Sequence, residues 1–406
     1  MATIKPYKAL RPKTELAKHV ASQPYDVLSS DEARKKVKDN PYSFLRITKS
    51  EVDLPDDIDI HTPVVYQKAK DNLKKFQQEA ILITEEKPCY YIYTLVMDGR
   101  SQTGLVCISA VEDYHTGVIK KHEFTRPEKE KDRIDHMTTI AAQTGKVFLA
   151  YHNVAEMDEL VNNWKQHHQP AYDFVADDDI QHTVWVVNDD ATIETITSLF
   201  KEKVPATYIA DGHHRAASAA KVSKELPENE NAQYFLTGIF PADELAIMDY
   251  NRLIKDLNGL SKEDFLTALE KDFDVQQSTT PVKPTRLHQF GMYLGGRWYN
   301  LQAKDDTYTT DPIGVLDVSI LSNNILDPIL GIKDQRTDKR IDFVGGIRGL
   351  DELVKRVDSG EMQVAFSLHP VTIQQLFDIA DSGNVMPPKS TWFEPKLRDG
   401  LLTHLL

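Results

Sequence analysis

Cysteine is nearly absent from this sequence of 406 residues, which contains only Cys89 and Cys107. A framework of several disulfide bonds is therefore excluded, although these two residues could pair. Both lie in apolar, strand-like runs, so we expect reduced thiols in the core of a cytoplasmic protein. The N-terminus has no apolar signal-peptide core, and no apolar run reaches the ~20 residues that a membrane-spanning helix needs. We expect no membrane partner.

Basic residues are also fewer than acidic residues. Lysine and arginine number 48 against 62 aspartate and glutamate, which gives a net charge of −14. A field of this sign repels polyphosphate backbones, so nucleic acid is not an expected partner. Hydrophobic residues at 41% and charged residues at 27% are typical of an ordinary globular protein.

Several common catalytic signatures are missing. The sequence has no G-x-x-x-x-G-K-[ST], no G-x-G-x-x-G before a helix and no G-x-S-x-G. P-loop, Rossmann and hydrolase-elbow chemistry therefore lose support. The zinc-protease pattern H-E-x-x-H begins at His122-Glu123 but fails, because the fifth position is Arg126.

Apolar periodicity and turn signals predict a mixture of helices and strands. Apolar residues at three- and four-residue spacing predict a helix over residues 63–79. Asp98-Gly99-Arg100 predicts a hairpin between strands at residues 89–97 and 103–111. Ser30 is the predicted N-cap of an earlier polar helix.

The domain organisation is predicted from composition. The composition changes near Asn258-Gly259, so we place a boundary there. The expected fold class is α/β, in the sense of mixed α+β, with residues 1–257 forming one domain and residues 258–406 a C-terminal α+β subdomain.

The run Asp211-Gly212-His213-His214-Arg215 lies between a predicted strand and an alanine-rich helix. Free backbone N–H groups and the positive end of the helix dipole favour an anion there. Gly212 permits close approach of the backbone, the two histidines can donate to phosphate oxygens, and Arg215 can grip two of them. Asp211 is then available for a cation or a hydroxyl. The alternative, a polar N-cap with two solvated histidines, fits this context less well.

A second candidate is the charged run from Lys120 to Arg133. Glu123, flanked by His122 and basic residues, suits a general base in a phosphate-rich site. A solvated charged helix is an equally good interpretation. The glycine turn at residues 343–349 could cradle an anion, although tight packing is the commoner role of such a turn.

Seven short motifs span residues 11 to 393. They are Arg11-Pro12, Pro24-Tyr25-Asp26-Val27, Asn40-Pro41-Tyr42-Ser43-Phe44-Leu45-Arg46, Gly117 to Thr125, Ala210 to Arg215, Tyr250-Asn251-Arg252 and Pro388-Lys389-Ser390-Thr391-Trp392-Phe393. Together they resemble the bacterial and archaeal family catalogued as domain of unknown function 1015.

The run Asp211 to Arg215 is also similar to that of free-serine kinases with a ParB/sulfiredoxin-like fold. The resemblance implies a ParB/sulfiredoxin-like core at about residues 100–250 and a kinase that makes O-phosphoserine from free L-serine. The expected phosphate donor is pyrophosphate, with ATP or ADP as the alternative, and the expected cofactor is Mg²⁺. Sulfiredoxin chemistry needs a cysteine in this motif, and there is none.

The resemblance also implies roles for individual residues. Glu123, Asp211 and His214 are the expected catalytic residues, with Asp211 holding the metal. The expected donor-phosphate ligands are Gly212, His213, His214, Arg215, Arg126 and Arg133, and the expected serine-binding residues are Tyr25, Asp26 and Arg46.

A nucleotide-binding switch without catalysis is the alternative function. ParB-type switches carry G-x-x-R-x-x-A, and Gly212 to Ser218 matches its first four positions with Ser218 in place of the alanine. The oligomeric state cannot be read from the sequence.

Overall fold

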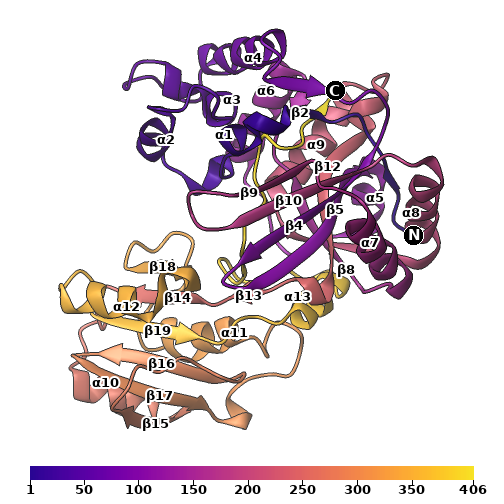
Figure 1. Ribbon diagram of the computed structural model, residues 1–406. Helices are drawn as coiled ribbons and strands as arrows, with labels where there is room; N and C mark the ends of the chain where they lie inside the picture. The colour runs from indigo at the N-terminus through magenta and orange to yellow at the C-terminus, as the bar shows by residue number, and fades with distance from the viewer. The chain divides into compact units, whose positions relative to one another are not determined.

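The computed structural model describes residues 1–406 and divides them into two units (Figure 1). Unit 1 comprises Met1–Leu245 and Pro395–Leu406, and unit 2 comprises Ala246–Glu394. We predicted the division at residue 257, with the C-terminus in the second part. The difference arises because strand β14 (Tyr250–Ile254) pairs with β18 (Ile341–Gly345) and β19 (Val364–Leu368), which belong to unit 2. The predicted mixed α/β fold class is confirmed; the ParB/sulfiredoxin-like core stays a prediction.

Unit 1 contains a nine-stranded sheet in the order β6-β11-β8-β12-β5-β4-β10-β9, with β1 paired to β5. The pairs β6–β11 and β8–β12 are parallel and the others antiparallel. The strands are β1 (Ile4–Lys5), β4 (Tyr90–Met97), β5 (Arg100–Ala110), β6 (Ile119–Lys120), β8 (Val147–Tyr151), β9 (Tyr172–Val175), β10 (Gln181–Val187), β11 (Thr207–Asp211) and β12 (Tyr234–Pro241).

Helices and two small two-stranded sheets complete unit 1. The predicted hairpin is confirmed as β4–β5, and the predicted helix over residues 63–79 as α4. The prediction of Ser30 as an N-cap was one residue late: Ser29 caps α2, because its side chain accepts from Glu32 N–H and Glu32 returns the bond. The α-helices are α1 (Ala17–Val20), α2 (Ser30–Val37), α3 (Leu45–Thr48), α4 (Pro63–Gln78), α5 (Val111–Thr116), α6 (Pro127–Ile140), α7 (Ala155–His167), α8 (Asp190–Lys203) and α9 (His213–Glu225). The two strand pairs are β2 (Leu10–Pro12) with β3 (Leu82–Thr84) and β7 (Ala142–Gln143) with β21 (His404–Leu405), and short 3-10 helices, among them Tyr25–Val27, lie between the other elements.

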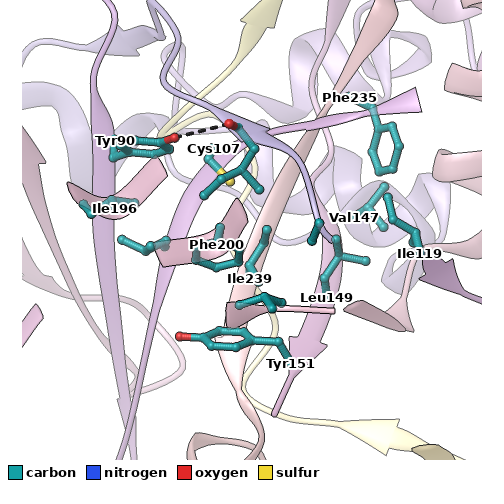
Figure 2. Close-up of a cluster of buried hydrophobic side chains, with 14 of the residues drawn as sticks. Tyr90, Cys107, Ile119, Val147, Leu149, Tyr151, Ile196, Phe200, Phe235 and Ile239 are labelled. Carbon is teal, nitrogen blue, oxygen red and sulfur yellow. Dashed lines mark hydrogen bonds between the residues drawn. The ribbon is translucent and has the colours of Figure 1, made fainter. Parts of the chain in front are cut away.

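The main core of unit 1 joins side chains of the sheet to those of its helices (Figure 2). Leu149 and Ile239 come from neighbouring strands, and Phe200 comes from α8. Cys107 lies in this cluster, and both cysteines are buried and free, which confirms the sequence prediction of core thiols.

Unit 2 is built on a six-stranded antiparallel sheet in the order β15-β17-β16-β19-β14-β18. The glycine turn after β18 is closely packed, because a Cβ on Gly346 would lie 2.2 Å from Asp249 Oδ1. No helix of either unit is both long and apolar enough to cross a membrane. The other elements are α10 (Lys262–Leu269), β15 (Phe273–Ser278), β16 (Gln289–Leu294), β17 (Arg297–Ala303), α11 (Asp317–Leu321), α12 (Gly349–Asp358), α13 (Ile373–Asp381), and β13 (Ile247–Met248) paired with β20 (Trp392–Phe393).

Candidate functional site

The predicted strand–turn–helix around Gly212 is confirmed. Strand β11 ends at Asp211, helix α9 begins at His213, and Gly212 between them has φ +96°. This left-handed conformation favours glycine. The turn leaves the first N–H groups of a 13-residue helix directed away from the helix body.

Gly212→Ala is expected to lower the free energy of unfolding by ~1–2 kcal/mol, because an L-residue is strained at this φ. Gly117→Ala is a matched control, since Gly117 also has a positive φ, +77°, and nothing lies within 4 Å of its added Cβ. Denaturant unfolding should show a similar loss for both variants. A Gly212→Ala protein as stable as the wild type would contradict the left-handed backbone conformation at residue 212.

Arg215 lies at the centre of a partly buried hydrogen-bond network. Its Nη2 donates to both carboxylate oxygens of Asp26, at 3.0 and 2.8 Å, and its Nη1 donates to the carbonyl oxygen of Lys146 at 2.8 Å. Asp211 Oδ2 lies 3.5 Å from Nη1. The guanidinium is therefore already engaged by the protein and ties the Gly212 turn to the 3-10 helix Tyr25–Val27, which carries Asp26.

Asp211 carries a cation on each carboxylate oxygen. Lys396 Nζ lies 3.5 Å from Oδ1, and Arg215 Nη1 lies 3.5 Å from Oδ2. Burial would raise the pKa of Asp211, but Lys396 and Arg215 outweigh it and lower this pKa to about 2. No group of three His, Cys, Asp or Glu side chains in the chain could hold a metal ion. The donor set at Asp211 does not fit a resident Mg²⁺ ion.

The two histidines of the motif are held by backbone donors from one segment. His213 Nε2 accepts from the His122 N–H at 3.4 Å, and His214 Nε2 accepts from the Arg126 N–H at 3.0 Å. An accepting Nε2 carries no proton, so each neutral ring carries its proton on Nδ1. His213 Nδ1 lies 3.6 Å from Glu123 Oε2. Burial lowers the pKa of His213 to about 3 and also lowers that of His214.

Four buried histidines of unit 1 should make the protein sensitive to acid. Burial lowers the pKa of His122, His182 and His213 to about 3 and that of His136 to about 4. The unfolded chain binds protons near pH 6.5, whereas these rings stay neutral in the folded state, so their stabilisation is present above pH 6.5 and is lost as pH falls towards 3. Asp399 opposes this trend, because burial raises its pKa to about 6.

Between pH 7 and pH 5.5 the free energy of unfolding is expected to fall by roughly 1 kcal/mol per buried histidine. Urea unfolding at the two pH values measures this fall. His122→Phe should make the dependence on pH shallower, because it removes one of the four rings. A free energy of unfolding that is the same at pH 7 and pH 5.5 would contradict the lowered pKa values of these buried histidines.

A cavity of about 570 Å³ opens beside His214 in unit 1. Arg133 lies in its wall, with Cζ 3.8 Å from the centroid of the Tyr25 ring and Nε donating to Asp132 at 2.8 Å. The other residues that line it are Asp26, Leu28, Thr48, Lys49, Ser50, Glu51, Ile60, His61, Val65, Tyr66, Glu128, Lys129, Lys131, Asp135 and His136. The cavity therefore presents both signs of charge.

Two carboxylates of the cavity wall are firmly placed. Asp132 accepts from the Tyr66 hydroxyl at 2.8 Å and lies 3.1 Å from His61 Nδ1. Glu51, which is buried, lies 3.1 Å from Lys49 Nζ. Such pairs hold charged groups in fixed positions at the surface of the cavity.

The structure distributes the predicted site residues over four places. Tyr25, Asp26, Arg133 and His214 line the cavity. The rest of the motif adjoins it through Arg215, and Glu123 and Arg126 lie in the segment over the two histidines.

Arg46 lies elsewhere. Its Nη2 donates to the carbonyl oxygen of Val37 at 2.8 Å, its Nη1 pairs with Asp53, and it does not line the cavity. These contacts give Arg46 a role in holding the helices of the N-terminal region together.

Among the charged and polar residues that sequence reasoning did not single out are Lys49, Glu51 and Tyr66 of the cavity and Lys396 beside Asp211. Lys49 and Glu51 lie three and five residues beyond the motif that ends at Arg46, and Lys396 lies three residues beyond the motif that ends at Phe393. The short distance of these three residues from the motifs along the sequence was the signal that could have identified them. Nothing in the local sequence indicates that Tyr66 faces Asp132.

The chain belongs to the family described as "Protein of unknown function (DUF1015)", whose model matches residues 4–319. No curated protein matches the sequence. Among solved structures, a free serine kinase in complex with AMP is 12% identical, with a TM-score of 0.35, and the match covers 76% of this chain and 92% of that one. A conserved hypothetical protein from Pyrococcus furiosus is 14% identical, with a TM-score of 0.34 and coverage of 73% and 94%. SbnI from Staphylococcus aureus with a C-terminal truncation is 10% identical, with a TM-score of 0.38 and coverage of 74% and 87%.

Proposed function

We propose that the protein is a phosphotransferase that makes O-phosphoserine from free L-serine, with pyrophosphate as the first choice of donor and ATP or ADP as the second. The observation that supports this proposal best is the cavity of mixed charge that adjoins the Gly212 turn through His214 and Asp26. A helix start binds phosphate well, and a cavity with both signs of charge suits a zwitterionic amino acid.

In this proposal the donor phosphates lie at the start of α9. The backbone N–H groups of His213 and His214 point out of the helix end, and the helix dipole favours negative charge there. Arg126, which is exposed beside His214, supplies further positive charge.

The acceptor serine would occupy the cavity. Arg133 and Lys49 are the proposed partners of its carboxylate, and Asp26 and Glu51 those of its ammonium group. The serine hydroxyl oxygen attacks the terminal phosphorus, the bridging P–O bond of the donor breaks, and the released phosphate takes the electrons of that bond. The hydroxyl proton passes to Glu123, the proposed general base.

Mg²⁺ enters this proposal as part of the donor. The ionisable groups around Arg215, which range from the exposed Asp26 to the buried Lys146, are balanced in charge, since the carboxylates of Asp26, Asp211 and Asp399 face the cations of Arg215, Lys146 and Lys396. Pyrophosphate would add several negative charges to this balanced cluster. We therefore propose that the substrate is the Mg²⁺ complex of the donor, in which the metal offsets that charge.

The test is incubation of the full chain with L-serine and Mg²⁺ and, in turn, pyrophosphate, ATP or ADP, followed by ³¹P NMR detection of O-phosphoserine. We expect product with at least one donor and none without serine. Absence of product with every donor would overturn the kinase proposal. Nucleotide binding without product would instead favour the switch.

A further inference from the structure

The C-terminal segment (Pro395–Leu406) is built into unit 1 by backbone pairing. Asp399 exchanges two backbone hydrogen bonds with Ser22, at 2.9 and 3.1 Å, and Thr403 exchanges two with Leu10, both at 2.9 Å. A Cβ on Gly238 in β12 would lie 2.7 Å from Leu397 Cδ1, so this glycine makes room for the segment. The segment is therefore fixed within the unit that contains the Gly212 turn.

A buried lysine links this segment to the motif arginine. Lys146 is 1% exposed, and its Nζ donates to the carbonyl oxygen of Arg398 at 2.8 Å. The carbonyl oxygen of the same lysine accepts from Arg215 Nη1 at 2.8 Å. Lys146, which directly precedes β8, therefore positions both the C-terminal segment and the guanidinium of the motif.

Lys396 brings an ammonium group to the end of β11. Its Nζ lies 3.5 Å from Asp211 Oδ1, and Asp211 precedes the first residue of α9 by two positions. Arg215, the arginine expected to grip the donor, directs Nη1 and Nη2 at Lys146 and Asp26. Lys396 therefore adds a second positive charge at Asp211, on the carboxylate oxygen that Arg215 does not contact.

We propose that Lys396 is a phosphate-binding residue of the donor site. Its ammonium group occupies the position beside Asp211 where the sequence analysis expected a metal ion. This inference rests on the donor site of the proposed function. It extends the site beyond residue 319, where the match to the family ends. An ammonium group on a flexible stem can remain beside Asp211 while it donates to a phosphate oxygen, because it has three donor hydrogens.

Isothermal titration calorimetry of the full chain with pyrophosphate in the presence of Mg²⁺, and in the absence of serine, tests the proposal. Lys396→Met is expected to weaken pyrophosphate binding at least ~10-fold, as the loss of a charge-assisted hydrogen bond to phosphate does. Lys396→Arg should stay within about 3-fold of the wild type, because it keeps the charge. Lys224→Met is the matched control: Lys224 is an exposed lysine near the other end of α9 and should bind like the wild type.

Manganese(II) supplies the second measurement. Electron paramagnetic resonance should detect no Mn²⁺ bound to the wild type without pyrophosphate. Mn²⁺ that binds without pyrophosphate and is lost in Asp211→Asn would overturn the proposal, as would wild-type pyrophosphate affinity in Lys396→Met. If Lys396→Met fails to fold, Lys396→Gln replaces it, and wild-type affinity in that variant has the same meaning.

These measurements separate the inference from the proposed reaction. If the wild type binds pyrophosphate through Lys396 but forms no O-phosphoserine, the kinase proposal fails and the role of Lys396 stands. If product forms and Lys396→Met binds pyrophosphate normally, the kinase proposal stands and the role of Lys396 fails. If the wild type binds no pyrophosphate, the same series with ATP decides, and no binding of either donor overturns both.

Discussion

Arg215→Lys is expected to reduce kcat/KM for O-phosphoserine formation at least ~30-fold. The planar guanidinium reaches Asp26 and the Lys146 carbonyl in two directions at once, which the ammonium group of lysine, with a shorter overall reach and no planar fork, cannot reproduce. A hydrogen bond to a charged group contributes about 1.5–3 kcal/mol, and about 1.4 kcal/mol corresponds to a tenfold change. Because Asp26 lines the cavity, its displacement should raise KM for serine as well as lower kcat.

Steady-state kinetics of Arg215→Lys measure the loss of activity, and thermal unfolding of the same variant measures any loss of stability. Arg34→Lys is the matched control, because Arg34 also bonds a backbone carbonyl, that of Leu54 at 2.9 Å, but lies outside the motif. The control should keep wild-type kinetics. An Arg215→Lys enzyme with wild-type kinetics would show that the network does not position the site.

Glu123→Gln is expected to lower kcat at least ~10²-fold while pyrophosphate binding stays close to that of the wild type. The amide keeps the size of the side chain and its contact with His213 but cannot accept the hydroxyl proton. A positioned base contributes about 10²- to 10⁴-fold to such a step. Comparison of kcat with the affinity from calorimetry separates loss of the base from loss of the donor site.

Glu112→Gln, an exposed glutamate on α5, is the control for this variant and should leave kcat unchanged. If Glu123→Gln keeps most of its turnover, the base must be sought among Asp26, Glu128, Asp132 and Asp211. The first three of these line the cavity, whereas Asp211 contacts Arg215 and Lys396.

The local parts of the site could be predicted from the sequence. The strand, the glycine turn and the helix start at Gly212 are determined by residues within a few positions of one another, and so are the β4–β5 hairpin and the periodic helix α4. For these elements, side-chain spacing and turn chemistry decide the conformation.

The partners of the motif could not be predicted in the same way. Arg215 and Asp26 are 189 positions apart, and no pattern in a single sequence reports such a contact. Tyr25, Asp26 and Arg46 all belong to short motifs, yet the first two reach the cavity and Arg46 bonds Val37 and Asp53. Tertiary packing decides which of these three residues reach the cavity, and their residue types do not. The division at residue 245 was missed for a related reason: β14 pairs with strands about 90 and 110 positions later along the chain.

The return of the C-terminal segment to unit 1 has a consequence for synthesis of the protein in the cell. Unit 2 has all its residues once Glu394 has been made, but unit 1 still lacks the strand β21 and the segment that pairs with Ser22 and Leu10. Contacts between the two ends of a chain close late and slow folding, and the growing chain emerges from its N-terminus. Residues 395–406 are made after every residue of unit 2, so during synthesis unit 1 acquires Lys396 and the pairing of β21 with β7 only after unit 2 has all its residues.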